Sequence, residues 1–374
     1  MGLFSGCASV VPQEAAILES GLSRAEIRSH HGRLNAPRFL GRRTATVGAS
    51  EAAGYIADRL GGLGIQPIHP GEYRHLTYQS INHISGLSIQ AINADSTIWV
   101  ADRSMIPDAR SGSLRGQITS VVRLDPRSAP PVALRGQAAI VDSALAEPFA
   151  VALAEAGFGL AFVVRSPPAG RASRPLPLAV IDLTAERLSE MLGRGAAGSG
   201  RGVTRTRLDV ILDASDDPVA GLVSVIGILP GSDPVLRDEL VLLVVNLDTG
   251  SYPARVPVLD SERSGVAAAA LLEVARVLGE ERHLGQGPAR SVMFAWLSGS
   301  TQNDKGVQAL VRRPPWPRDA IYRIYTAGTE VSEGGLGPRS LKVGSDALHE
   351  GEDAGAIGMR LAERLYDSIR ASAY

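Results

Sequence analysis

Two apolar runs with polar ends decide the fold of this chain: Glu239-Leu-Val-Leu-Leu-Val-Val-Asn-Leu-Asp248 and Ser291-Val-Met-Phe-Ala-Trp-Leu-Ser-Gly-Ser-Thr301. Each run predicts a buried strand, because a strand covered on both faces shows no polar alternation. Between them, Leu259-Asp-Ser-Glu-Arg-Ser-Gly265 opens an alanine-rich helix. A strand, a helix and a second strand predict a parallel pair whose polar carboxyl ends lie side by side.

Strands and helices continue to alternate after the second run. We expect a short helix after residue 303, a strand over 320–325 and a final helix over 356–372. The helix over 264–278 is expected to turn its alanines and leucines toward the sheet, with Glu273, Arg276 and Glu280 on the opposite side. This alternation predicts an α/β fold with three layers (α/β/α) around a mostly parallel central sheet.

Residues 87–214 differ from the rest of the chain in their pattern, because turns rich in proline, glycine and arginine separate short apolar runs there. Two helices are expected there, one capped by Gly157 and one by Thr184. Leu114-Arg-Gly-Gln117 recurs as Leu134-Arg-Gly-Gln137, and each copy is expected just before a strand. The glycine-rich segment 193–202 predicts a mobile loop. The expected strands are 97–100, 138–141, 159–164 and 178–181.

Composition limits the function classes. With 38 Lys+Arg against 39 Asp+Glu, the net charge is -1, so no overall field attracts nucleic acid or an anionic membrane. Cys7 is the one cysteine, which excludes an internal disulfide and a cysteine-based zinc cluster. Its context, Leu3-Phe-Ser-Gly-Cys-Ala-Ser9, is similar to the end of a bacterial lipoprotein signal without the preceding apolar stretch. Cys7 is therefore either a lipidation site or an ordinary residue of the terminus.

Two further segments belong with the runs quoted above: Leu222-Val-Ser-Val-Ile-Gly-Ile-Leu-Pro-Gly-Ser-Asp-Pro234 and the turn Arg38-Phe-Leu-Gly-Arg-Arg-Thr44. Together these segments form a set of motifs that we call the frame. In order and spacing this frame resembles the zinc-dependent aminopeptidase and glutamate carboxypeptidase family, which are co-catalytic di-zinc exopeptidases. The resemblance implies a peptidase-like domain over 23–86 and 215–374, after a leader over 1–22. It also implies that 87–214 is a β-rich insert resembling the protease-associated domain, without catalytic residues of its own.

The resemblance places two zinc ions at the polar strand ends, and nearly every ligand position there holds a poor ligand in this chain. The family's first histidine corresponds to Asn246, a neutral amide that binds zinc weakly. Its general base corresponds to Ser300, which cannot take a proton from a metal-bound water near neutral pH. The remaining ligand positions correspond to Ser261, Thr301, Tyr325 and Ala347.

Three acidic residues of the frame are retained: Asp248, Asp260 and Asp346. A one-residue slip of the alignment would bring Asp260 to the bridging position in place of Ser261. His349 follows Ala347 by two residues and is interpreted as a solvated loop histidine.

These substitutions favour a catalytically silent relative that binds a protein or peptide partner. On this hypothesis no cofactor is expected, although the resembling family uses zinc. The expected location is a bacterial cell envelope or periplasm, with membrane contact only through a lipid anchor at Cys7.

Three alternatives stay open. In the first, shifted carboxylates rebuild a site for one hard cation such as Ca²⁺ or Mg²⁺, so that the chain is a metal-dependent exopeptidase with a rearranged site. In the second, Ser300 is a nucleophile, although no Gly-x-Ser-x-Gly motif supports it. In the third, the insert carries the function by binding a partner. The carboxylates of the first alternative are Asp248, Asp260, Glu262 and Asp304.

Overall fold

The structure is a computed structural model. It describes residues 21–92, 98–100, 105–107, 111–142, 145–164, 176–192, 203–248, 259–300, 304–327, 340–343 and 353–374. The expected loop at 193–202 lies outside these residues, as do Cys7, Thr301, Asp346, Ala347 and His349. The first turn of the helix that contains Asp260, Ser261 and Glu262 is described only in its backbone.

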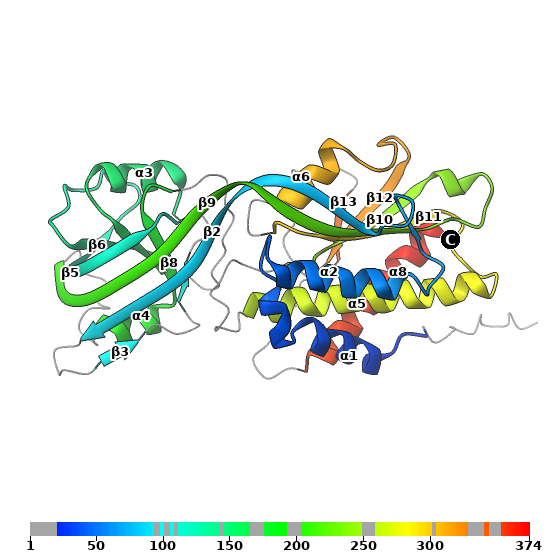
Figure 1. The fold of residues 1–374 in the computed structure, drawn as a ribbon, viewed down its shortest axis with the longest axis horizontal. Helices are drawn as coiled ribbons and strands as arrows, with labels where there is room; N and C mark the ends of the chain where they lie inside the picture. The colour runs from blue at the N-terminus through cyan, green and yellow to red at the C-terminus, as the bar shows by residue number, and fades with distance from the viewer. Residues whose placement is uncertain are drawn as a thin grey trace, which may run out of the picture.

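The two deciding runs form neighbouring parallel strands, as predicted. They are β10 (Leu240–Asn246) and β11 (Ser291–Leu297), and every residue of both is buried. On the other side of β10 lie β12 (Ile321–Ala327) and β13 (Ser340–Val343), both parallel to it. The long strand β9 (Val203–Leu229) runs antiparallel to β11 (Figure 1). The sheet is therefore mixed, and the strands β10 to β13 form a parallel block within it.

Helices cover both faces of this block, so its strands need no polar residues. On one face pack α1 (Arg24–Leu34), α2 (Val47–Leu60), α5 (Leu259–His283) and α8 (Ala354–Ala373), with the short η1 (Pro37–Arg42) between α1 and α2. On the other face packs α6 (Lys305–Arg312). Three layers result, as the sequence predicts. No helix among the described residues is long and apolar enough to span a membrane.

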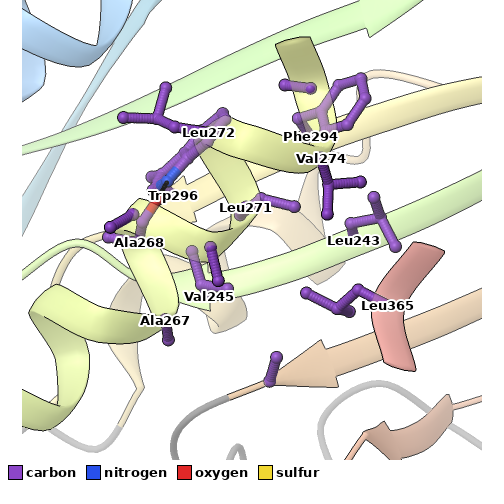
Figure 2. Close-up of a cluster of buried hydrophobic side chains, with 14 of the residues drawn as sticks. Leu243, Val245, Ala267, Ala268, Leu271, Leu272, Val274, Phe294, Trp296 and Leu365 are labelled. Carbon is purple, nitrogen blue, oxygen red and sulfur yellow. Dashed lines mark hydrogen bonds between the residues drawn. The ribbon is translucent and has the colours of Figure 1, made fainter. Parts of the chain in front are cut away.

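Helix α5 lies at the centre of the larger core. Figure 2 shows its residues Ala267, Ala268 and Leu271 against side chains of β10 and β11. Trp296 is fully buried there, and its indole nitrogen donates a hydrogen bond of 3.1 Å to the Ala268 carbonyl. The small side chains of α5 allow this close approach to the sheet.

Glu273 lies on the side of α5 opposite the sheet, yet it is buried. Helix α1 packs against α5, and Ser23 at its start contacts Glu273, which is 0% exposed. Its carboxylate accepts hydrogen bonds from the Ser23 N–H (2.5 Å) and from the Arg276 guanidinium (2.6 and 2.9 Å). The helix period identified the sheet-facing side correctly, but it carried no information about a second layer of helices.

A two-stranded ribbon leaves the parallel block. Strand β2 (Arg74–Ile92) pairs antiparallel with β9 along almost its whole length, and β1 (Gln66–Pro67) pairs with the end of β9. Figure 1 shows β2 and β9 running from the helix-covered block to a second group of strands. The expected boundaries at 86/87 and 214/215 both fall inside these strands, so one continuous sheet joins the two parts.

The second group of strands has its own hydrophobic clusters. Here β5 (Leu114–Leu124), β6 (Gln137–Val141), β7 (Leu160–Val164) and β8 (Ala179–Leu183) run parallel. One cluster packs beneath α3 (Glu147–Glu155) and another beneath α4 (Ala185–Leu192). The short strands β3 (Ile98–Val100) and β4 (Ile106–Pro107) pair at the edges.

Two of the predicted helix caps in this part are confirmed. Gly157 has a left-handed φ of 95°, and the Thr184 hydroxyl accepts a hydrogen bond of 3.3 Å from the Arg187 N–H. The repeated tetrapeptide behaves differently in its two copies. Leu134-Arg-Gly-Gln137 leads into β6 as predicted, whereas Leu114-Arg-Gly-Gln117 forms the start of β5 itself. Pairing of β5 with β9 makes the difference, because β9 supplies ladder partners to residues 114–118.

Candidate functional site

The ends of β10 and β11 meet, which brings their polar residues together. In the parallel register Asn246 lies opposite Leu297, and Asp248 and Ser300 follow two and three residues later. Asn246 is 4% exposed and Asp248 is 1% exposed. Gly299 turns the chain after β11 with a φ of 87°, a conformation that a residue with a Cβ adopts only under strain.

Asp248 is saturated by donors of the chain itself. Its Oδ2 accepts hydrogen bonds from the Gly299 N–H (2.6 Å) and the Thr44 hydroxyl (2.8 Å). Its Oδ1 accepts hydrogen bonds from the Ser300 N–H (3.2 Å) and the Ser300 hydroxyl (2.9 Å). A carboxylate offers about four lone-pair positions, and these contacts use all of them.

Burial raises the pKa of Asp248, and the hydrogen bonds from Gly299, Thr44 and Ser300 oppose that rise. Because all of these groups donate, they stabilise the ionised carboxylate. The arrangement holds the carboxyl group in place through protein dipoles, and it leaves the carboxylate no lone pair for a metal ion.

Arg42 is a buried cation on which the charge of Asp248 acts. It is 0% exposed, and its guanidinium donates hydrogen bonds to the carbonyl oxygens of Leu247 (3.0 Å) and Leu34 (2.5 Å) and to Asn35 Oδ1 (2.8 Å). Burial lowers the pKa of Arg42 to about 10, and Asp248 opposes that fall. The guanidinium therefore keeps its charge at neutral pH.

Backbone strain is concentrated around Asp248. Among the described residues, Arg42, Ala45 and Asp304 are the non-glycine residues with positive φ, at 54°, 56° and 51°. Arg42 lies two residues before Thr44 and Ala45 follows it, and Thr44 donates to Asp248. Asp304 precedes Lys305, whose N–H donates to the Gly299 carbonyl (3.1 Å). Strain of this kind persists only where the surroundings fix the backbone, and it is common at functional sites.

The turn that contains Thr44 and the start of α6 also contact the β2–β9 ribbon. Arg43 donates a hydrogen bond of 2.7 Å to the Ile84 carbonyl, and Lys305 donates one to the Ser80 carbonyl. The β2–β9 register shifts next to both carbonyls, between Gln79 and Ile81 and between Ile84 and Gly86. Residues next to the donors of Asp248 therefore also bind the ribbon at its two register shifts.

The sequence-predicted site residues do not all meet at these strand ends. Asn246, Asp248 and Ser300 come together there. Tyr325 does not, because it lies within β12 opposite Leu243, packs in the core beside α8 and hydrogen bonds Ser372 at 2.5 Å. Its placement at a strand end is wrong, since β12 continues to Ala327. The described backbone places Asp260 and Ser261 in the first turn of α5.

Sequence reasoning missed Arg42 and Thr44 as site residues. Both belong to the turn Arg38-Phe-Leu-Gly-Arg-Arg-Thr44, which the sequence marks as part of the frame without linking it to the strand ends. The available signal was the Arg42-Arg-Thr44 run in a turn that the sequence already marks as part of the frame.

The described residues do not fit a pair of zinc ions. Within the described part of the chain, no group of three or more His, Cys, Asp and Glu side chains is placed to hold a metal. Asn246 offers an amide, which is a poor zinc ligand, and Asp248 is saturated by protein donors.

Comparison with solved structures shows where this fold occurs. A peptidase M28 precursor from Shewanella amazonensis superposes with a TM-score of 0.54 at 13% identity, over 82% of this chain and 75% of that one. BSAP, a zinc aminopeptidase from Bacillus subtilis, superposes with a TM-score of 0.52 at 13% identity, over 83% and 70%. The chain is a distant structural relative of zinc aminopeptidases. No protein-family model and no curated protein matches its sequence.

Proposed function

We propose that this chain is a catalytically silent relative of the zinc aminopeptidases that binds a protein or peptide partner. One observation carries the proposal: the carboxylate retained at the strand ends, Asp248, accepts four hydrogen bonds from Gly299, Ser300 and Thr44. A metal ion could bind it only by displacing donors that are built into the turns. The amide of Asn246 beside it offers no compensating affinity.

The proposal extends to the rest of the site and to the division of the chain. Ser261, Thr301 and Ala347 stand at the other ligand positions, and Ser300 stands in place of the base. Segment 87–214 is an insert that the β2–β9 ribbon carries, and it contributes no catalytic residue. The separate clusters beneath α3 and α4 support this division.

Metal content measured by mass spectrometry tests the proposal, on protein purified without chelators and again after incubation with zinc and dialysis. We expect zinc well below one equivalent in both samples and no cleavage of an aminoacyl-nitroanilide or an acidic dipeptide. A ligand that binds the folded state raises its stability by RT ln(1 + [L]/Kd). Because we expect no zinc binding, zinc should leave the melting temperature unchanged. Stoichiometric zinc that survives dialysis would overturn the proposal.

A restored histidine gives a sharper version of this test. Asn246→His returns one ligand, and we expect neither zinc retention nor peptidase activity, because Asp248 remains saturated and the base position remains Ser300. Asn246→Gln is the matched control for the change in side-chain size. Metal-dependent cleavage by Asn246→His alone would mean that the other ligands are present.

A further inference from the structure

The β2–β9 ribbon has two long edges, and they are built differently. Over residues 74–79 of β2, which we call the open edge, no strand of the described chain pairs with the side that faces away from β9. Strand β3 reaches only the far end of β2, at Gln90–Ile92. The open edge therefore lies along the outside of the sheet.

The direction of the main-chain groups follows from the ladder. The Ile226 N–H donates to the Tyr73 carbonyl at 2.9 Å, and the antiparallel register pairs Leu76 with Val223 and Tyr78 with Gly221. In an antiparallel ladder, alternate residues direct both N–H and C=O toward the partner strand. Residues 73, 75, 77 and 79 therefore bond to β9, and the main-chain groups of Arg74, Leu76 and Tyr78 point away from it.

Both ends of the open edge are closed by side chains. The Arg74 N–H donates to Glu72 Oε1 at 2.9 Å. At the other end, the carbonyl of the next residue, Ser80, accepts a hydrogen bond from Lys305. What remains is a window of one short strand, centred on Leu76 and Tyr78.

The side chains in this window are apolar and exposed. Leu76 is 49% exposed and Tyr78 is 64% exposed, and both project from the same face because they are two residues apart. An added strand would find main-chain partners along the edge and apolar surface at alternate positions. This combination is the recognition surface used in strand addition.

The opposite edge, on β9, has features that prevent the addition of another strand. Pro218 has no N–H, and the Val219 N–H is bonded to Asp217 Oδ1 at 3.0 Å, where the register shifts. Ser113 bonds both main-chain groups of Ala214, at 2.9 and 2.7 Å. Proline, charged residues and bulges are how sheet edges are blunted. Residues 74–79, with the sequence Arg-His-Leu-Thr-Tyr-Gln, contain no proline and no acid, and their one arginine, Arg74, is paired with Glu72.

We propose that the open edge binds an extended peptide segment of a partner protein, which adds an antiparallel strand to β2 and packs alternate apolar residues on Leu76 and Tyr78. A second copy of this chain fits less well. Self-pairing about Leu76 would place Tyr78 opposite Arg74, whose N–H already bonds Glu72, so a ladder bond would be lost at each end.

This inference names the form of the partner in the proposed binding role, but it does not depend on loss of the metal site. A chain with peptidase activity could use the same edge. A positive zinc or peptidase assay would therefore leave the edge proposal standing, and failure of the edge experiment would leave the silent-site proposal standing.

A fluorescent eight-residue peptide in which valine alternates with threonine, with lysine at each end, serves as the probe for anisotropy measurements. Leu76→Pro removes an N–H that points away from β9, so the ladder to β9 keeps its bonds. We expect binding to weaken about tenfold, because an added-strand hydrogen bond and the apolar contact of the Leu76 side chain are both lost. Leu76→Thr keeps the main-chain groups and should weaken binding less. Val235→Thr, at a site 79% exposed elsewhere, is the matched control and should bind as the wild type does.

Amide hydrogen exchange on the wild-type protein keeps the proposal testable if Leu76→Pro does not fold. The Leu76 and Tyr78 amides should exchange quickly without peptide and slow down with it, while the Thr77 amide, bonded to β9, should be slow in both. Absence of peptide binding and of this protection would overturn the proposal. A concentration-dependent dimer that protects the same amides without peptide, and that Leu76→Pro abolishes, would assign the edge to a second copy instead.

Discussion

Two buried carboxylates hold distant parts of the chain together, and their partners differ. Asp248, at the ends of β10 and β11, accepts only from neutral donors, and the charge of Arg42 acts on it through space. Glu273, in α5, accepts from the Arg276 guanidinium and from the Ser23 N–H. Arg276 is 23% exposed, so water still reaches the cation that pairs with Glu273.

The N-terminal segment closes both sites. Thr44 donates to Asp248, and Ser23 donates to Glu273 while the Gly21 carbonyl accepts from Arg276 at 2.6 Å. A buried acid at a strand end is therefore not by itself a sign of catalysis, because the chain can use the same group as an anchor for a distant segment. The two acids differ in how far the free energy of unfolding should fall when the charge of each is removed.

The largest effect is expected at Asp248. In Asp248→Asn the amide nitrogen must face two of the present donors, and Arg42 loses its counter-charge in a buried site. We expect the free energy of unfolding in urea to fall by about 3 kcal/mol. Thr44→Val, which removes one donor and keeps the carboxylate, should cost about 1 kcal/mol. A loss for Asp248→Asn no greater than that for Thr44→Val would show that the saturated carboxylate is not an anchor.

A smaller effect is expected at Glu273. Glu273→Gln loses the charge-assisted hydrogen bonds to Arg276, but that cation is partly solvated and also bonds Glu280 at 2.6 Å. We expect a loss of about 2 kcal/mol in urea unfolding, with faster tryptic cleavage at Arg24 as the N-terminal segment loosens. Glu280→Gln is the matched control, because Glu280 binds the same cation from the surface. Equal losses for the two variants would contradict the anchoring role of Glu273.

Much of the fold could be predicted from apolar patterning. β11 occupies 291–297 within the run quoted for it, and β10 and α5 follow their runs closely, because burial on both faces forces a continuous apolar sequence. The burial of Glu273 could not be predicted in this way. Helical periodicity reports one buried face, and α1, which buries the other, comes from a segment about 250 residues away in the chain.

The candidate site was predicted only in part. Asn246, Asp248 and Ser300 followed from strand ends that meet at one edge of the sheet. Tyr325 was misplaced because nothing in the sequence Ile321-Tyr-Arg-Ile-Tyr-Thr-Ala327 marks where β12 ends. Thr44 and Arg42 required knowledge of a long-range contact, which strand and helix patterns do not contain.

The smallest expected effect concerns pH and belongs to the Glu273 side of the comparison. His30 on α1 is 7% exposed, and its Nδ1 lies 2.7 Å from the Tyr55 hydroxyl. Burial lowers the pKa of His30, and the charges that face it are Arg59, Glu26, Glu273 and Arg276. A lowered folded-state pKa means that the unfolded chain binds more protons near pH 6.

The stability that neutral His30 contributes is therefore present above its ordinary value of about 6.5 and is lost as the pH falls through the lower folded-state value. We expect the free energy of unfolding to decrease between pH 7.5 and 5.5, with a His30 share below about 1 kcal/mol. His75, whose pKa burial also lowers, contributes in the same direction. His30→Gln keeps a polar partner for Tyr55 without titrating, so its pH slope should be flatter. Identical slopes for His30→Gln and the wild type would mean that His30 accepts a proton inside the folded core, and that Glu273 rather than Arg276 or Arg59 controls its charge.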